Sequence, residues 1–281
     1  MELSTTFLLF IAAFGASALG GVLGMASGIF IVPILTMFFG IDFHVAIGAS
    51  LISVIACSCG SASSFLKERL TNVRLAIVLE SATTFGALTG ALLIGLIPTS
   101  FLYGLFAFIL ILSAQQMLAQ RREVVSLVEK GQQDWGTTLQ LHSSYPDAVL
   151  GKEIPYSVGR VPLGMFLMYF AGMMSALLGI GSGVLKIPAM DKALRLPIKV
   201  SSATSNFMIG VTAAASAAVY LARGDIDMNI AGPVALGSVV GALIGARLLI
   251  GISSEKLRIG FVIILGVLAV QMLMSALGIQ V

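Results

Sequence analysis

Apolar stretches long enough to cross a lipid bilayer recur from one end of this chain to the other. They fall at residues 5–22, 28–39, 44–66, 74–97 and 98–119, and again at 162–180, 183–191, 199–222, 229–251 and 257–278. About 20 apolar residues in a helix span the hydrocarbon core of roughly 30 Å. Only 10% of the 281 residues are charged, whereas a soluble domain carries about 25%. The sequence therefore predicts an all-α polytopic membrane protein, whose surroundings are a lipid bilayer.

The two runs of apolar segments are copies of one another at a fixed offset. Pro33 and Pro188 lie 155 positions apart, and the same offset aligns Ser27 with Ser182 and Ser50 with Ser205 without a gap. A single register held over about 100 residues indicates internal duplication rather than shared apolar composition. We divide the chain into a first membrane repeat at 1–119, a polar connector at 120–160 and a second membrane repeat at 161–281.

The charges of equivalent loops predict that the repeats are inverted. The loop at 67–74 holds three basic residues, whereas its counterpart after residue 222 holds one basic and two acidic residues. The connector at 191–199 holds three basic residues, whereas its counterpart holds only Asp42 and His44. Lysine and arginine favour the cytoplasmic side. Placing 67–74, 120–160, 191–199 and 251–258 inside puts 13 of the 16 basic residues in the cytoplasm. Both termini are then expected outside, in the cell's inner (plasma) membrane.

This layout requires residues 5–42 and 162–194 each to cross the membrane an even number of times. Each stretch contains a long apolar segment, a glycine cluster and an apolar piece of roughly 10 residues, which is too short to span alone. We therefore expect two discontinuous helical hairpins, each followed by three transmembrane helices. Within the connector, alternation at 139–142 and turn residues at 144–147 suggest a small hairpin-like cap.

The glycine clusters at 24–28 (GMASG) and 179–183 (GIGSG) are the first candidate for a binding site. A helix that starts in mid-membrane presents free N–H groups and the positive end of its dipole, which together favour anions. The alternative is close packing of helices by small residues. Because the clusters occur at equivalent places in both halves, we favour a central site, as in inverted-repeat transporters.

Several residues near these clusters are candidates for binding substrate. Hydroxyl and amide groups can replace the water around a polar substrate, or can simply bond neighbouring helices together. Lys186 can counter an anion or extend to the aqueous edge, and Glu80 can relay protons, pair with a cation or lie at the inner edge. The candidate set is Ser27, Gly28, Ser50, Gly181, Ser182, Gly183, Lys186, Thr204, Ser205 and Asn206.

Other patterns limit the classes of function. We find no H-E-x-x-H motif and, apart from His44 at the edge of 44–66, neither paired aspartates nor a histidine within an apolar span, so we expect no catalytic residues, no metal site and no cofactor. A net charge of +3 is too small to suggest nucleic acid. Small-residue stripes such as Gly86-x-x-x-Gly90 and Gly237-x-x-x-Gly241 predict close helix packing, within or between protomers. With the family resemblance described next, they lead us to expect a homodimer.

The doubled motif resembles the signature of a known family. Residues 179–188 (GIGSGVLKIP) look like the glycine-rich, proline-ended motif of the TauE/SafE family of sulfite exporters. Residues 46–51 (AIGASL) are similar to another of its elements, with Ala49 in place of threonine, and Ala26 replaces a glycine expected in the first-half motif. Residues 199–220, with Ala203, Thr204 and Ser205, are similar to its second-half counterpart.

The resemblance implies export of small anions such as sulfite or organosulfur compounds. We expect alternating access around a mid-membrane site. A non-transporting membrane scaffold or assembly factor and an intramembrane enzyme are the alternatives.

Overall fold

The computed structural model describes residues 3–23, 27–118, 135–147, 152–248 and 254–278. Its first half consists of α1 (Leu3–Leu23), α2 (Gly28–Phe38), α3 (Phe43–Lys67), α4 (Val73–Leu93) with the short 3-10 turn η1 (Ile94–Leu96), and α5 (Thr99–Leu118). Its second half consists of α7 (Val161–Leu178), α8 (Gly183–Leu194), α9 (Ile198–Arg223), α10 (Met228–Leu248) and α11 (Ser254–Ala276). Each apolar segment of the sequence forms one helix.

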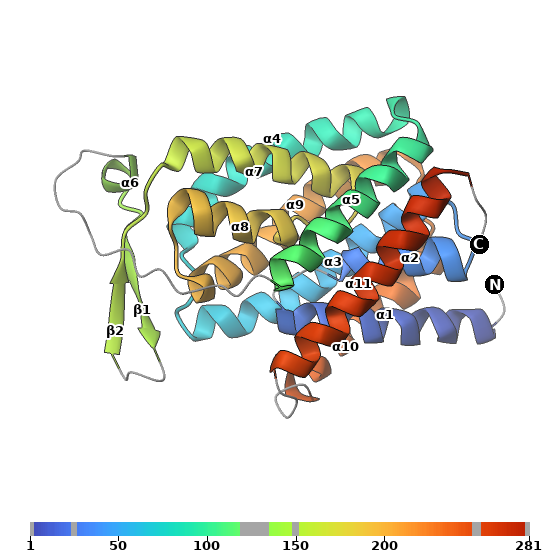
Figure 1. Cartoon of the computed structure of the whole chain (residues 1–281), viewed down its shortest axis with the longest axis horizontal. Coiled ribbons are helices and arrows are strands. Elements are labelled where there is room, and N and C mark those ends of the chain that lie inside the picture. Colours follow the sequence, from blue (N-terminus) through green and yellow to red (C-terminus); the bar gives the residue numbers. More distant parts are fainter. Residues whose placement is uncertain (1–2, 24–26, 119–134, 148–151, 249–253, 279–281) are drawn as a thin grey trace.

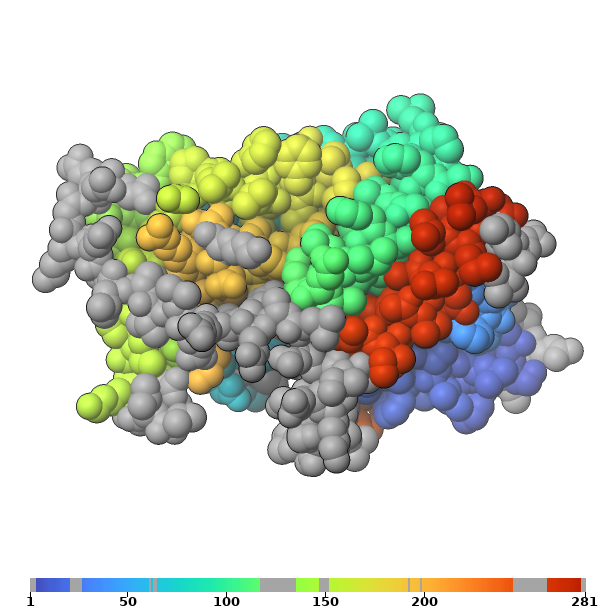
Figure 2. All heavy atoms as spheres, viewed as in Figure 1, coloured from blue at the N-terminus to red at the C-terminus, as the bar shows by residue number. Residues whose placement is uncertain are grey.

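The helices have the length and composition of a membrane protein. Within the described residues, five are long and apolar enough to cross a bilayer, namely α3, α4 with η1, α5, α7 and α9. Shorter apolar helices lie at Ser4–Gly20, Gly28–Phe38, Met228–Ile244 and Val262–Ala276. Much of the face in Figure 2 belongs to α5, α7 and α11, whose exposed large side chains include Phe101, Phe108, Phe166 and Ile263. Such surfaces suit contact with lipid, so the all-α, multi-pass membrane class is confirmed.

Helices of the two halves pack in matching pairs. In each half the first helix lies against the fourth helix of the other half, so that α1 contacts α10 and α7 contacts α4. The third helices, α3 and α9, lie together, as do the fifth helices, α5 and α11 (Figure 1). Each of these contacts between a helix of the first half and a helix of the second half therefore has an equivalent contact with the roles of the two halves reversed.

The small-residue stripes make these contacts close. A Cβ atom on Gly86 of α4 would lie 1.9 Å from the carbonyl oxygen of Tyr169 in α7. A Cβ atom on Gly241 of α10 would lie 2.3 Å from the carbonyl oxygen of Phe14 in α1. The stripes thus serve packing inside one chain, where only glycine lets the backbones approach so closely.

The described part of the connector forms a small cap. It contains α6 (Trp135–Thr138) and two antiparallel strands, β1 (Ser143–Asp147) and β2 (Lys152–Tyr156). The hairpin-like cap expected from the sequence is confirmed. Residues 144–147, expected to be turn residues, instead form most of β1, because Tyr145 is buried in an apolar cluster with the ends of α4, α8 and α9. In Figure 1 this hairpin lies at one end of the molecule, and the start of α1 and the end of α11 lie at the other.

Asn72 joins the cap to the membrane helices. Its side chain caps α4 by accepting a hydrogen bond from the backbone N–H of Leu75, and it donates to the Tyr156 hydroxyl at 3.0 Å and to the Leu141 carbonyl at 2.9 Å. Burial raises the pKa of Tyr156 above its ordinary value, which already lies well above neutral pH.

Candidate functional site

Both halves contain a short helix that begins inside an apolar stretch. In the second half α7 ends at Leu178, the chain turns through Gly179 and Gly181 with φ of 64° and 61°, and α8 begins after Ser182. Only glycine adopts such angles without strain. In the first half α1 ends at Leu23 and α2 begins at Gly28, while positions 24–26, including Ala26, lie outside the described residues.

The two breaks touch each other. A Cβ atom on Gly28 would lie 2.2 Å from the carbonyl oxygen of Gly179. Ser50 of α3 donates its hydroxyl to this same oxygen at 2.7 Å. The start of α2 and the end of α7 therefore meet at one carbonyl group, which brings residues about 150 positions apart in sequence to the centre of the helix bundle.

Hydroxyl groups at equivalent positions of the two halves have different surroundings. Ser27 is bonded to Ser53 at 2.9 Å, and Ser53 in turn to Ser238. The second-half counterparts of Ser27 and Ser50 are Ser182, at the start of α8, and Ser205, in α9. Both are fully buried, and within the described residues their hydroxyl groups have no hydrogen-bond partner. Buried hydroxyl groups are normally bonded. These two are free to bond to a ligand, as are the hydroxyl groups of Ser17, Thr71, Ser175 and Ser201, which are also buried without a partner in the described part of the chain.

A buried charge pair joins α8 of the second half to α4 of the first half. The Nζ atom of Lys186 in α8 is 3.2 Å from the Oε2 atom of Glu80 in α4. It also donates to the hydroxyl of Thr212 in α9 at 2.6 Å, and that hydroxyl donates to Oε1 of Glu80 at 2.6 Å. Lys186 and Thr212 are fully buried and Glu80 is 9% exposed. The three groups form an electrically neutral cluster that joins three helices, and Thr84 also donates to Oε1 of Glu80 at 3.3 Å.

This cluster decides two alternatives that the sequence leaves open. Lys186 does not extend to an aqueous edge, and Glu80 pairs with a cation rather than lying unpaired at the inner edge. In the register of the repeat, the positions equivalent to Glu80, Lys186 and Thr212 are Ala235, Ile31 and Cys57, none of which is charged. The cluster, which joins α4 of the first half to α8 and α9 of the second, therefore has no copy at the equivalent position of the repeat.

Helix geometry connects the cluster with the unpartnered hydroxyl groups. Ser182 and Lys186 are four residues apart and Ser205 and Thr212 are seven apart, spacings that put each pair on one face of its helix. Because α8 packs against α9, these faces share one interface. Thr212 was absent from the sequence prediction, although its spacing of two turns from Ser205 was a usable signal.

The remaining predicted residues have structural roles or lie at the break. Thr204 accepts a hydrogen bond from the backbone N–H of Asn72 at 3.2 Å. The side-chain amide of Asn206 donates to the carbonyl of Ser202 in its own helix, at 3.1 Å. Gly181 and Gly183 belong to the backbone of the break itself.

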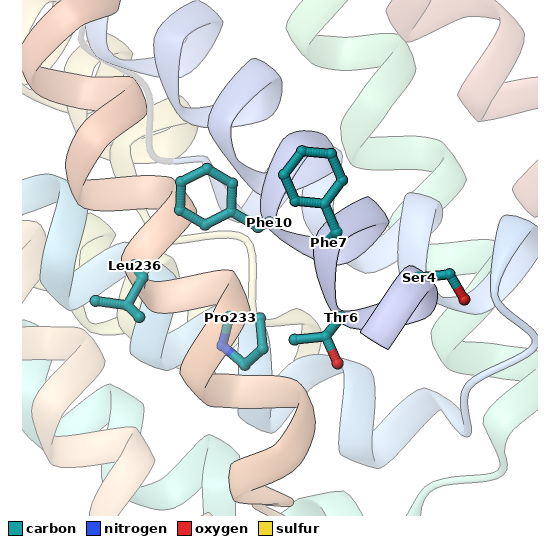
Figure 3. Close-up of a pocket in the computed structure, with 6 residues that line it drawn as sticks. All are labelled: Ser4, Thr6, Phe7, Phe10, Pro233 and Leu236. Carbon is teal, nitrogen blue, oxygen red and sulfur yellow. The ribbon is translucent and has the colours of Figure 1, made fainter. Parts of the chain in front are cut away.

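A separate apolar hollow lies between α1 and α10 (Figure 3). Its lining includes Phe7 and Phe10 of α1 and Pro233 and Leu236 of α10, together with Ser4 and Thr6. None of these lining side chains is charged, so the hollow offers no counter-charge for an ion.

A multi-pass helical bundle with two interrupted helices and buried polar groups at its centre has the architecture of a membrane transporter. The family model described as Sulfite exporter TauE/SafE matches residues 9–272, and the chain belongs to this family. The resemblance seen in the sequence is thereby confirmed.

Known relatives agree with this class. The chain is 28% identical over 227 residues to a probable membrane transporter protein of Bacillus subtilis, YdhB, covering 81% of this chain and 83% of the relative. A second probable membrane transporter protein of that organism, YunE, is 25% identical over 241 residues, which cover 83% of this chain and 84% of the relative. A probable membrane transporter protein of Methanocaldococcus jannaschii is 26% identical, covering 95% of each chain. No solved structure matches this chain with significance. Family and relatives point to a membrane transporter rather than an enzyme.

Proposed function

We propose that this transporter exports small anions, such as sulfite or organosulfur anions, by alternating access around a site at the start of α8. The observation that carries the proposal is the unpartnered, fully buried hydroxyl group of Ser182 at that helix start, together with that of Ser205 in α9, which packs against α8. From the first half, Ser50 donates its hydroxyl to the carbonyl group of Gly179, and Gly28 lies against the same oxygen, while Ser27 next to Gly28 bonds to Ser53.

The energies suit a substrate that must be released as well as bound. A small oxyanion cannot enter hydrocarbon unless other groups replace its water. The start of α8 offers oriented N–H groups, worth about 0.3–1 kcal/mol and up to about 2 kcal/mol when partly buried. Each hydroxyl bonded to a charged group adds about 1–3 kcal/mol. The sum predicts weak binding, which turnover requires.

We further propose that the two halves are inverted repeats. The pairing of helices is unchanged on exchange of the halves. In Figure 1, α2 lies toward the chain ends and α8 toward the β-hairpin, which supports hairpins that enter from opposite faces. The charge bias of the loops favours a cytoplasmic cap and external termini in the inner membrane.

A homodimer remains our proposal from the family resemblance. The small-residue stripes no longer argue for it, because Gly86 and Gly241 contact other helices of the same chain.

The alternatives explain less. A scaffold without transport gives no reason for unpartnered hydroxyl groups at the centre of the bundle. An intramembrane enzyme needs a nucleophile with a base or a metal within reach, and in the Glu80–Lys186–Thr212 cluster the carboxylate is already bonded to the lysine and the threonine.

A flux assay in proteoliposomes tests the proposal. Purified protein is reconstituted with a panel of internal anions, namely sulfite, sulfate, sulfoacetate and chloride, and their release is timed with and without a proton gradient. We expect release of at least one oxyanion well above that from protein-free vesicles. Equal release in both preparations for every anion would contradict the proposed function.

A further inference from the structure

The neutral cluster of Glu80, Lys186 and Thr212 sets a condition on any anion that binds beside it. The start of α8 and Lys186 lie on one face of the same helix, separated by about 6 Å of axial rise. In the empty site the lysine charge is balanced by Glu80. An anion that arrives at the start of α8 leaves the buried region with one uncompensated negative charge, which is unfavourable in a low-dielectric interior.

Only a proton or another cation restores neutrality, and Glu80 is the carboxylate placed to receive it. We propose that transport is coupled to protons at Glu80, which takes up one proton as a monoanion binds. This inference rests on the proposed anion transport and adds the identity of the coupling ion.

The geometry describes how the exchange proceeds. A proton adds to the Oε2 atom of Glu80, and the ionic contact of this atom with Nζ of Lys186 breaks. The Thr212 hydroxyl continues to donate to Oε1, so the protonated carboxyl group keeps a partner. The lysine ammonium group is then available to the anion. Release of the anion reverses both changes, and the pair of charges forms again.

Among the described residues, no charged group other than Lys186 pairs with Glu80. Tyr169 of α7 bonds to Thr89, more than two turns along α4 from Glu80. Tyr220 bonds to the carbonyl of Ala176, and Arg223 pairs with Asp225. The other titratable or charged residues of the helices that pack around Glu80 lie by sequence near helix ends. They are Arg74 in the first turn of α4, Asp191 and Lys192 in the last turns of α8, and Lys199 in the first turn of α9.

The coupling has a consequence for energetics. A monoanion that moves with one proton carries no net charge, so an outward anion gradient drives export without help or hindrance from the membrane potential. By linkage, protons and anion must each raise the affinity of the site for the other.

Three proteins in sealed vesicles test the inference: wild type, Glu80→Gln and the control Glu68→Gln, which alters an exposed carboxylate outside the helices. A trapped pH dye reports protons while anion release is timed. For wild type and Glu68→Gln we expect about one proton per monoanion and a rate unaffected by an imposed potential. Gln at position 80 can still accept from Thr212 but cannot bind a proton. We therefore expect Glu80→Gln to keep anion–anion exchange, to lose proton movement, and to lose the dependence of exchange on pH.

The outcomes separate the two proposals. Anion release by wild type without proton movement, or with movement of Na⁺ in its place, overturns proton coupling and leaves anion transport standing. Normal proton movement by Glu80→Gln also overturns it. If Glu80→Gln does not fold, the proton count for wild type decides alone. Absence of release for every anion tested removes the proposed function, and this inference with it.

Discussion

The contact between the two breaks yields a prediction whose size follows from the structure. Replacing Gly28 with alanine puts a Cβ atom 2.2 Å from the carbonyl oxygen of Gly179 and 2.7 Å from the hydroxyl oxygen of Ser50. Carbon–oxygen contacts in proteins are normally about 3.3 Å or longer. The start of α2 must therefore move away from α7 by about 1 Å, and the hydrogen bond from Ser50 to Gly179 is expected to break.

These changes predict a substantial loss of stability. Overpacking costs about 1–3 kcal/mol, and loss of the hydrogen bond costs about 0.5–1.5 kcal/mol, so Gly28→Ala should destabilise the protein by roughly 2–4 kcal/mol. Gly15→Ala in α1 is a matched control, since nothing lies within 4 Å of its added Cβ. Alanine favours a helix over glycine by about 1 kcal/mol, so the control should be neutral or stabilising.

Unfolding in mixed micelles by titration with sodium dodecyl sulfate measures the difference between these two variants. If their unfolding free energies agree within about 0.5 kcal/mol, the two breaks are not in contact as described.

Further predictions concern the cap, the site and the orientation. Asn72→Ala removes the N-terminal capping residue of α4 and its two hydrogen bonds to Leu141 and Tyr156 of the connector. It should therefore lower the free energy of unfolding by about 1–3 kcal/mol and speed limited proteolysis of the connector. Gly183→Val should abolish anion release without loss of membrane insertion, because its side chain blocks the backbone approach to the start of α8. Lys186→Ala should raise the apparent KM for the anion, measured in the same flux assay. In a background without the exposed native cysteine, an impermeant thiol reagent applied to intact cells should label Met228→Cys and spare Thr137→Cys; the reverse pattern would invert the proposed orientation.

The apolar segments and the repeat were sufficient to predict the helices. Their ends agree with the structure because glycine, proline and charged residues mark them, as at Gly28, Gly183 and Arg223. The cap was less predictable. A turn at 144–147 was expected from Pro146 and its neighbours, but burial of Tyr145 outweighs that local preference and the segment forms a strand.

The site could be predicted only in part. Repeat alignment located Ser182 and Ser205, yet it could not show that their hydroxyl groups lack partners while those of Ser27 and Ser50 have them. That difference arises from side chains of other helices. Likewise the partner of Lys186 lies 106 positions away in sequence, and no local pattern connects it with Glu80.

The central claim is that Ser182 and Ser205 bind the transported anion. The most direct test is the initial rate of radiolabelled sulfite release from proteoliposomes for the Ser182→Ala/Ser205→Ala double variant. Its control is Ser113→Ala, a buried serine whose hydroxyl bonds to the carbonyl of Ile109 in its own helix. With wild type active, we predict that the double variant loses about tenfold or more in kcat/KM, since each lost bond to a charged ligand is worth about 1–3 kcal/mol, while the control stays near the wild-type rate. Equal rates for all three proteins would show that the anion does not bind at the start of α8.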